Sequence, residues 1–204
     1  MIITLIAAAV SAIVIPGANV RTATMIRADY PAALKRAGEQ GIVVQRILVS
    51  PDGRALSCVP VQTIGNPLLG EASCKSFLRW RLDRPKGADG EPIHALIQPV
   101  TYFVSGSGPM SSIRRSADIQ LRAQGVRESS QVLLYVQIGS NGRVLHCGNS
   151  KREDDPLVDA ACVVAEDATW EVVHDQNGVA VPYVRHLHVQ FDPDTDEGEG
   201  VANP

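Results

Sequence analysis

The residues of this chain whose types and spacing could support chemistry are first of all its cysteines. Four cysteines occur in 204 residues, in two pairs, Cys58 with Cys74 and Cys147 with Cys162. The pairs are spaced sixteen and fifteen residues apart, unlike the close Cys-x-x-Cys spacing of zinc and thiol-redox sites. One disulfide within each pair is the simplest interpretation, and it requires an oxidising compartment. Four buried, reduced thiols are the alternative.

Histidine offers a second kind of site. His186 and His188 flank Leu187, so on a strand both would point to one face and could hold a metal. His146 beside Cys147 could approach them in space. An exposed strand face explains the histidine pair equally well.

Candidates for catalysis are scattered along the chain and form no recognised nucleophile–base motif. They are Ser50, Asp52, His94, Asp154 and Asp155. The glycine-containing stretch Ser105–Ser112 lacks the strand-to-helix context and the lysine of a phosphate loop. The sequence therefore predicts a protein that is not an enzyme and needs no cofactor. A metal-binding protein or an enzyme of the periplasm is kept as an alternative.

The composition argues against a nucleic-acid partner. Hydrophobic residues make up 45% of the sequence and charged residues 20%, with a formal net charge of -3. Phosphate binding needs a concentrated basic face, which this balance does not favour.

The N-terminus carries an apolar run, Ile2–Ile15, that ends at Pro16 and Gly17. The run is too short to cross a bilayer comfortably and is typical of a signal-peptide core. No lysine or arginine precedes it, so residues 1–23 are expected to be either a signal peptide or a retained anchor. Export to the periplasm agrees with the predicted disulfides. Contact with a membrane is expected only if the run is retained.

The elements that would position the cysteines occur twice in the same order. Residues 28–104 are expected to hold a helix at Ala32–Ala37, strands at Val43–Val49 and Ala55–Ile64, a helix from Asn66 and a last strand at Ile93–Val104. Residues 113–192 are expected to hold a helix at Ile113–Gln124, a strand at Val132–Ile138, a helix from Asp155 and a last strand at Val181–Phe191. A flexible linker at residues 105–112 joins the lobes, and residues 193–204 form a disordered acidic tail.

Turn residues and prolines order the strands within each lobe. Asp52-Gly53 and Asn141-Gly142 are hairpin signals, because glycine permits the backbone angles of a tight turn. Pro60 and Pro99 lack a donor, so their strands should not be central, which leaves Val43–Val49 in the middle. The predicted fold class is α+β, with two tandem lobes. Each lobe is a three-stranded antiparallel sheet packed against two helices and crosslinked by one disulfide.

A series of motifs then points to a known family. They are Tyr30-Pro31, Gly41-x-Val43, Asp52-Gly53, Leu69 to Trp80-Arg81-Leu82, Gly90-x-Pro92-Ile93 and Pro99-Val100-Thr101-Tyr102-Phe103. In this order and spacing they resemble the TonB C-terminal domain over Tyr30–Val104. The stretch Gln131–Phe191 resembles an eroded second copy, in which Trp170 follows two positions later than the register of Trp80.

The resemblance implies a periplasmic domain that binds a short segment of an outer-membrane transporter, added as a strand to the sheet edge. Only about a dozen residues separate the apolar run from Tyr30, and no proline-rich spacer is present. We therefore expect a protein-binding module for a TonB-dependent transporter or another envelope protein. A short membrane-anchored energy transducer is the alternative.

The final strand of each lobe is the expected binding edge, because an exposed edge offers unpaired main-chain groups to an extended peptide. The predicted edge residues are Ile93, Ala95, Ile97, Tyr183, Arg185, Leu187 and Val189. The second edge, Tyr183–Val189, is expected to be less obstructed, since Leu187 stands where the first lobe has Pro99. The alternative is an edge covered by the other lobe.

Overall fold

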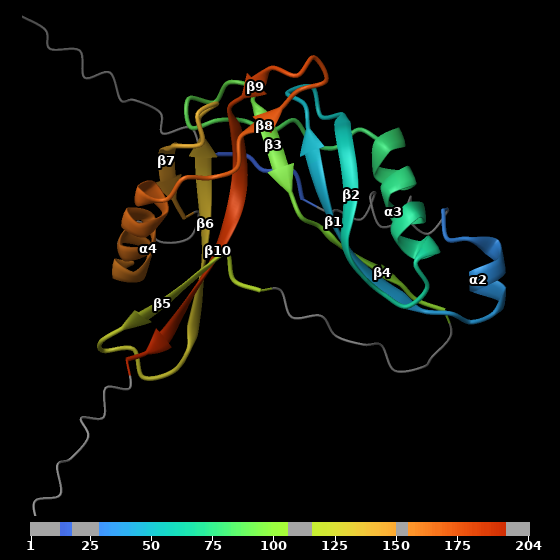
Figure 1. Cartoon of the computed structure of the whole chain (residues 1–204), viewed down its shortest axis with the longest axis horizontal. Helices are drawn as coiled ribbons and strands as arrows, with labels where there is room; N and C mark the ends of the chain where they lie inside the picture. The colour runs from blue at the N-terminus through green and yellow to red at the C-terminus, as the bar shows by residue number, and fades with distance from the viewer. Residues whose placement is uncertain (1–12, 18–28, 106–115, 150–154, 195–204) are drawn as a thin grey trace, which may run out of the picture.

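The computed structural model describes residues 13–17, 29–105, 116–149 and 155–194, and these form an α+β fold (Figure 1). The helices are α2 (Ala32–Arg36), α3 (Leu68–Arg79) and α4 (Pro156–Asp167). The strands are β1 (Gly41–Val49), β2 (Ala55–Ile64), β3 (His94–Ile97), β4 (Val100–Phe103), β5 (Ile119–Ala123), β6 (Ser130–Ile138), β7 (Val144–Gly148), β8 (Val173–His174), β9 (Ala180–Val181) and β10 (Tyr183–Pro193). We call residues 29–105 the first half and residues 116–194 the second half.

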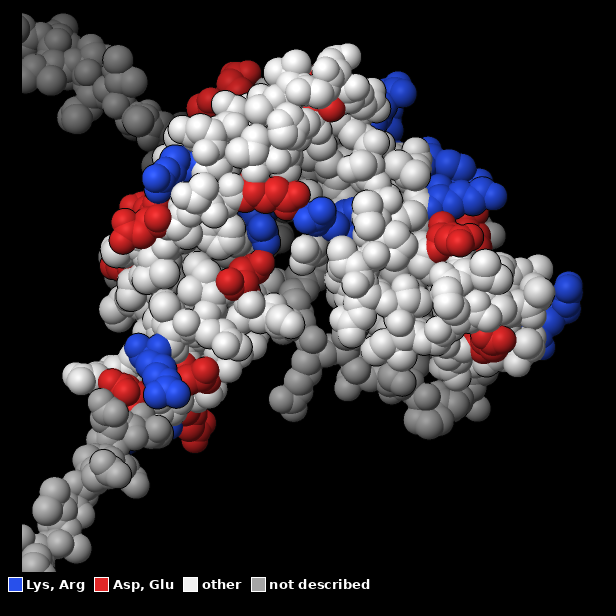
Figure 2. Space-filling model, viewed as in Figure 1, with Lys and Arg blue, Asp and Glu red and all other residues white. Residues whose placement is uncertain are grey.

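The central strand of each half is the expected one. In the first half, β1 lies between β2 on one side and β3 and β4 on the other, all antiparallel to it. In the second half, β6 lies between β7 and β10 in the same way. Pro60 is on the outer strand β2, and Pro99 lies at the break between β3 and β4. Acidic and basic side chains are interspersed over the visible surface (Figure 2), in keeping with the small net charge.

Both predicted disulfides are confirmed. Cys58 on β2 is bonded to Cys74 on α3, and Cys147 on β7 is bonded to Cys162 on α4, with Cα–Cα distances of 5.4 Å and 5.7 Å. Each bond fastens a helix to the outer strand of its hairpin. Asp155 caps α4 as predicted, and its side chain accepts the Leu157 N–H at 3.0 Å. The cap of α3 is Pro67 rather than the expected Asn66, whose side chain accepts the Leu68 N–H at 3.1 Å.

A shared turn contact aligns the two halves. The Leu82 N–H donates to the Gly53 carbonyl oxygen, and the Trp170 N–H donates to the Gly142 carbonyl oxygen, both at 2.8 Å. Both glycines have positive φ, +85° and +76°, and an added Cβ would lie 2.4 Å from a backbone oxygen. Only glycine fits there without strain. Trp170 therefore occupies the position of Leu82, which explains its two-residue offset from Trp80.

The two halves join into one sheet through their closing strands. β3 and β10 run parallel, with Tyr183 opposite His94 and Val184 opposite Ala95. The sheet order is β2-β1-β3-β10-β6-β7, and the remaining strands β4 and β5 pair with β1 and β10. Figure 1 shows α3 and α4 near opposite ends of this sheet.

Side chains cross this seam in both directions. Val184 packs in the core of the first half, under α3, whereas Tyr183 packs in the core of the second half, under α4. Because successive strand residues point to opposite faces, the two helices cover opposite faces of the sheet. Leu96 of β3 and Leu48 of β1 in turn pack in the core of the second half. Each half thus completes the core of the other.

One predicted element is wrong. The helix expected at Ile113–Gln124 is, in its described part, the strand β5, which pairs in parallel with β10. The apolar residues alternate with polar ones in the order Ile119, Gln120, Leu121, Arg122, Ala123. This period of two fits a strand with one face on the core, and a helix would need a period of 3.6.

The end of the N-terminal apolar run belongs to the fold. Val14 forms two backbone hydrogen bonds with Lys86, both 3.0 Å long, and Ile13 and Ile15 pack against the core of the first half. Within the described part of the chain, no helix has the length and apolar character needed to span a membrane. The rest of the predicted signal or anchor, the linker after Ser105 and the acidic tail after Asp194 lie outside the described residues.

We expect the disulfides to contribute strongly to stability. Replacing Cys58 and Cys74 by serine should lower the free energy of unfolding by about 3 kcal/mol, because a loop of this size no longer restricts the unfolded chain. Urea denaturation measures the change, and the Cys147→Ser, Cys162→Ser double variant is the matched control, with a separation of 15 against 16 residues. Losses under about 1 kcal/mol in both variants would contradict this role.

Candidate functional site

The structure brings the two predicted binding strands together. The outer side of β3 pairs with β10 at His94 and Ala95, and β10 pairs with β5 from Val189 to Pro193. The expectation that Tyr183–Val189 is the less obstructed edge is therefore wrong. β3 pairs with Tyr183 and Val184 at one end of this stretch, and β5, the strand that takes the place of an expected helix, pairs with Val189 at the other. Whether the predicted edge residues bind a partner stays a prediction.

Most of the predicted edge residues are buried. These are Ile93, Ala95, Ile97, Tyr183, Leu187 and Val189. Their side chains belong to the two cores, so only their main-chain groups could serve a partner. Arg185 alone among them is not fully buried: its side chain is 11% exposed and lines the cavity described next.

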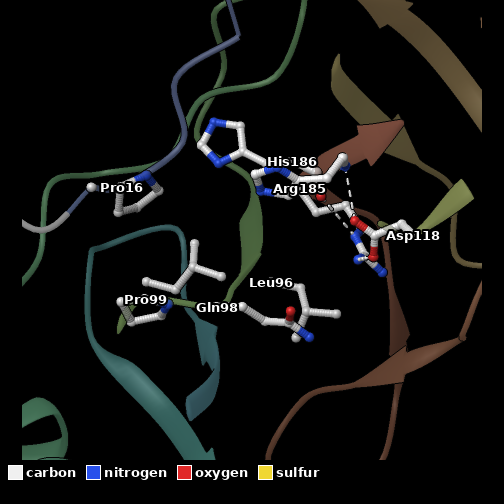
Figure 3. Close-up of a pocket in the computed structure, with 10 residues that line it drawn as sticks. Pro16, Leu96, Gln98, Pro99, Asp118, Arg185 and His186 are labelled. Atoms are coloured by element: carbon white, nitrogen blue, oxygen red, sulfur yellow. Dashed lines mark hydrogen bonds and ion pairs between the residues drawn. The ribbon is translucent and has the colours of Figure 1, made fainter. Parts of the chain in front are cut away.

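A small cavity marks the place where β3 and β10 diverge. Its volume is about 130 Å³, and Figure 3 shows Leu96 and Pro99 on the side of the first half and Arg185 and His186 on β10. Pro16 from the N-terminal segment also lines it. The volume is below the 300 Å³ or so of typical small-molecule sites, so the cavity fits a side chain rather than a cofactor.

Beyond Val184, a carboxylate caps the exposed side of β10. The Arg185 guanidinium lies 2.6 Å from one oxygen of Asp118, and the His188 N–H donates to the other at 2.9 Å. The Asp118 N–H donates in return to the His188 carbonyl oxygen at 2.8 Å. Arg185 also lies 5.5 Å from the Trp170 ring centre, a cation–π contact. The edge of β10 between β3 and β5 is thus occupied from within the chain.

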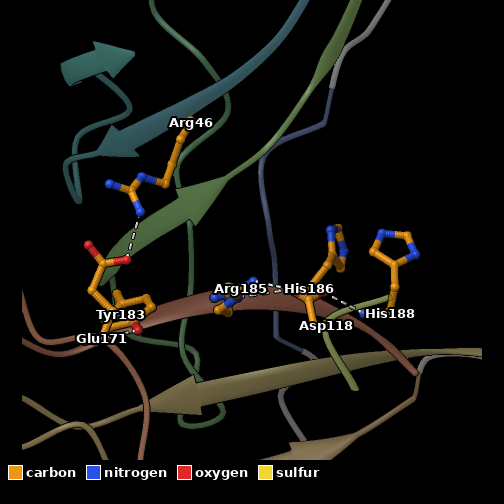
Figure 4. A network of polar contacts seen from close by, with 7 residues as sticks. All are labelled: Arg46, Asp118, Glu171, Tyr183, Arg185, His186 and His188. Atoms are coloured by element: carbon orange, nitrogen blue, oxygen red, sulfur yellow. Dashed lines mark hydrogen bonds and ion pairs between the residues drawn. The ribbon is translucent and has the colours of Figure 1, made fainter. Parts of the chain in front are cut away.

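A polar link through Glu171 fastens the two halves (Figure 4). The Tyr183 hydroxyl donates to the Glu171 carbonyl oxygen at 2.7 Å, and the Glu171 side chain forms a 2.9 Å ion pair with Arg46 of β1. The sequence singled out neither Arg46 nor Glu171 for this role, because no local pattern marks a contact across 125 positions.

β3 and β4 form one side of the first half, next to β1, and β4 is the part of this side that β10 does not cover. Among the described residues it pairs with β1 alone. The Gln45 N–H donates to the Pro99 carbonyl oxygen at 3.3 Å, which fixes the alternation of the ladder. Since donors and acceptors of an antiparallel strand alternate between its two sides, Thr101 faces β1, whereas Val100 and Tyr102 turn their N–H and C=O groups away.

The candidates for catalysis and metal binding that the structure describes make contacts within turns, helix caps and ring pairs. The Ser50 hydroxyl donates to the Asp52 carboxylate within the β1–β2 turn, and Asp155 caps α4, while Asp154 lies outside the described residues. Burial lowers the pKa of His94 from its ordinary value. The His186 and Tyr135 rings pack edge to face, with centroids 4.7 Å apart. Within the described ranges, no three His, Cys, Asp or Glu side chains are grouped to hold a metal ion.

The half formed by α2 to β4 is a small α+β unit with its own disulfide and with a last strand, β4, that pairs with β1 alone among the described strands. Residues 27–104 match the family model of the Gram-negative bacterial TonB protein C-terminal domain. The first half of the chain therefore belongs to the TonB C-terminal family, as the sequence motifs predicted. The match ends at residue 104, so it does not include the second half. A comparison with curated proteins gives no match.

The buried tyrosine at the seam predicts a pH dependence. Burial raises the pKa of Tyr183 to about 12, above the value of about 10 for an exposed tyrosine. Its contribution to stability is therefore complete below about pH 10 and is lost as the pH rises toward about 12. Tyr183→Phe should flatten this decline in urea unfolding experiments. The control is Tyr102→Phe, at an exposed tyrosine; an equally steep decline in all three proteins would contradict the prediction.

Proposed function

We propose that this protein is a TonB-like interaction module of the cell envelope that takes an extended partner segment as an added strand along β4. The observation that carries the proposal is the outer side of β4, which pairs with no strand of the described residues and lies in the half that matches the family model. Two disulfides, which need an oxidising compartment, support a periplasmic location. The partner is an outer-membrane transporter or another envelope protein.

The surroundings of β4 supply both affinity and selectivity for such a segment. Val100 and Tyr102 present main-chain donors and acceptors at alternate positions, the arrangement used in β-strand addition. The Tyr102 side chain is 50% exposed and Val104 is 52% exposed, so both can contact a guest side chain. The cavity beside Pro99 lies at the β3 end of this edge and can receive a further side chain.

The position of Ile13–Gly17 supports a second candidate, the short anchored transducer. These residues pack on the first half through the Val14–Lys86 bridge and the contacts of Ile13 and Ile15. We propose that they stay in the working protein, so that any cleavage falls before Ile13 rather than near residue 23. Mass spectrometry of the exported protein distinguishes the two: an intact Met1 supports the anchored form, and cleavage before Ile13 supports the exported module.

A proline at one outward-facing position tests strand addition. Tyr102→Pro removes a donor from the free side of β4 while leaving the β1–β4 hydrogen bonds in place, because the Tyr102 N–H points away from β1. We expect binding of extended peptides from the N-terminal segments of transporters encoded in the same genome to weaken by about tenfold or more. Fluorescence anisotropy with labelled peptides measures the affinity.

Tyr102→Ala is the matched control, since it removes the side chain and keeps the N–H. The control should lose less affinity than the proline variant, and circular dichroism should show both variants folded. If the two folded variants bind the peptides equally, main-chain pairing at β4 is not the binding mode.

A further inference from the structure

A second surface of the first half has the features of a protein-binding site, away from β4. It is a hollow of about 480 Å³ between the β1–β2 turn and the end of α3, with Gln176 of the second half at its rim. We call it the arginine hollow, after Arg54, Arg79 and Arg81, which line it. The backbones of Arg54 and Arg81, two of its lining residues, form an antiparallel bridge beside the Leu82–Gly53 hydrogen bond.

Positive charge exceeds negative charge inside the arginine hollow. Arg54 and Arg81 share a single carboxylate, Asp52, at 3.1 Å and 3.8 Å, and the side chains of the two arginines are 64% and 56% exposed. A guanidinium has five N–H donors, so one shared carboxylate leaves donors that can bind another acid. Arg79 at the rim pairs with Asp29. This local excess stands out in a chain whose formal net charge is -3.

Large apolar side chains lie next to these arginines. Trp80 is 37% exposed and Leu78 is 49% exposed, and both line the hollow. Tryptophan and arginine are the residue types that dominate binding energy at protein interfaces. The combination fits a partner segment with carboxylates for the arginines and an apolar side chain for Trp80.

The second half shows that the fold does not need these residues. The bonds of Leu82 to Gly53 and of Trp170 to Gly142 put the two corners in register. In this register the positions of Arg79, Trp80 and Arg81 are taken in the second half by Asp167, Ala168 and Thr169. Asn141 takes the position of Asp52. The backbone contact is thus the same at both corners, while the cluster of Arg79, Trp80 and Arg81 occurs in the first half alone.

We propose that the arginine hollow binds an extended acidic segment of a partner protein, with Arg54 and Arg81 holding carboxylates and Trp80 contacting an apolar side chain. The proposal does not depend on strand addition at β4, since the two surfaces use different elements.

The test uses a labelled synthetic peptide, Glu-Asp-Leu-Glu-Asp-Leu-Glu-Asp, and anisotropy titrations of the full chain. Arg81→Glu and Arg54→Glu should each weaken binding by about tenfold or more, with a loss that is smaller at high salt. Arg143→Glu is the matched control, because Arg143 takes the position of Arg54 in the second half and the charge change is identical. It should change the affinity by less than about twofold. Trp80→Ala should weaken binding without changing its salt dependence.

Each outcome decides the proposal. Loss of binding in the Arg81 and Trp80 variants, with Arg143→Glu unaffected, supports it, provided that thermal unfolding shows the variants to be folded. An equal loss in all three arginine variants would mean non-specific charge attraction and overturn it. Inorganic triphosphate that competes as well as the peptide would overturn the choice of an acidic protein segment, because the hollow would then be a general anion site.

Discussion

The parallel contact between β3 and β10 is the constraint on which the arrangement of the whole molecule depends. It joins two small sheets into one and places α3 and α4 on opposite faces. Leu96 enters the core of the second half and Val184 the core of the first. Small domains bury a limited fraction of their surface, so exchanging core residues across a seam adds apolar burial that neither half has alone. The Arg46–Glu171 ion pair and the Tyr183 hydrogen bond extend the same contact with polar groups.

The seam also decides which strand edges stay open. It occupies β3 at His94 and Ala95, while β5 and Asp118 occupy the rest of β10. Of the last strands of the two halves, β4 alone keeps an outer side that no described strand covers, and it follows the break at Pro99. The strand with this open side, β4, thus belongs to the half that matches the TonB C-terminal family. The second half covers β3 through β10, so the open stretch is limited to β4.

The sequence predicted the parts of the structure that depend on local rules. Hairpin glycines, the β1 and β6 strands, the Asp155 cap and the cysteine spacing all carry their own signal, and all are confirmed. β5 was predicted as a helix, although its residues alternate, because its strand partner lies some seventy positions away on β10. That error, together with the unforeseen pairing of β3 with Tyr183 and Val184, accounts for the wrong choice of open edge. Contacts across the seam, such as Leu96 with the core of the second half, have no local signal at all.

Site-resolved amide hydrogen exchange of the unliganded protein tests the central claim most directly, by comparing Tyr102 on β4 with His188 on β10. The Tyr102 N–H points to the open side of the sheet and should exchange rapidly, faster than its neighbour Thr101, which bonds to β1. The His188 N–H is held by Asp118 and should be protected. Strong protection of Tyr102 together with rapid exchange at His188 would contradict a sheet that is closed along β10 and open along β4.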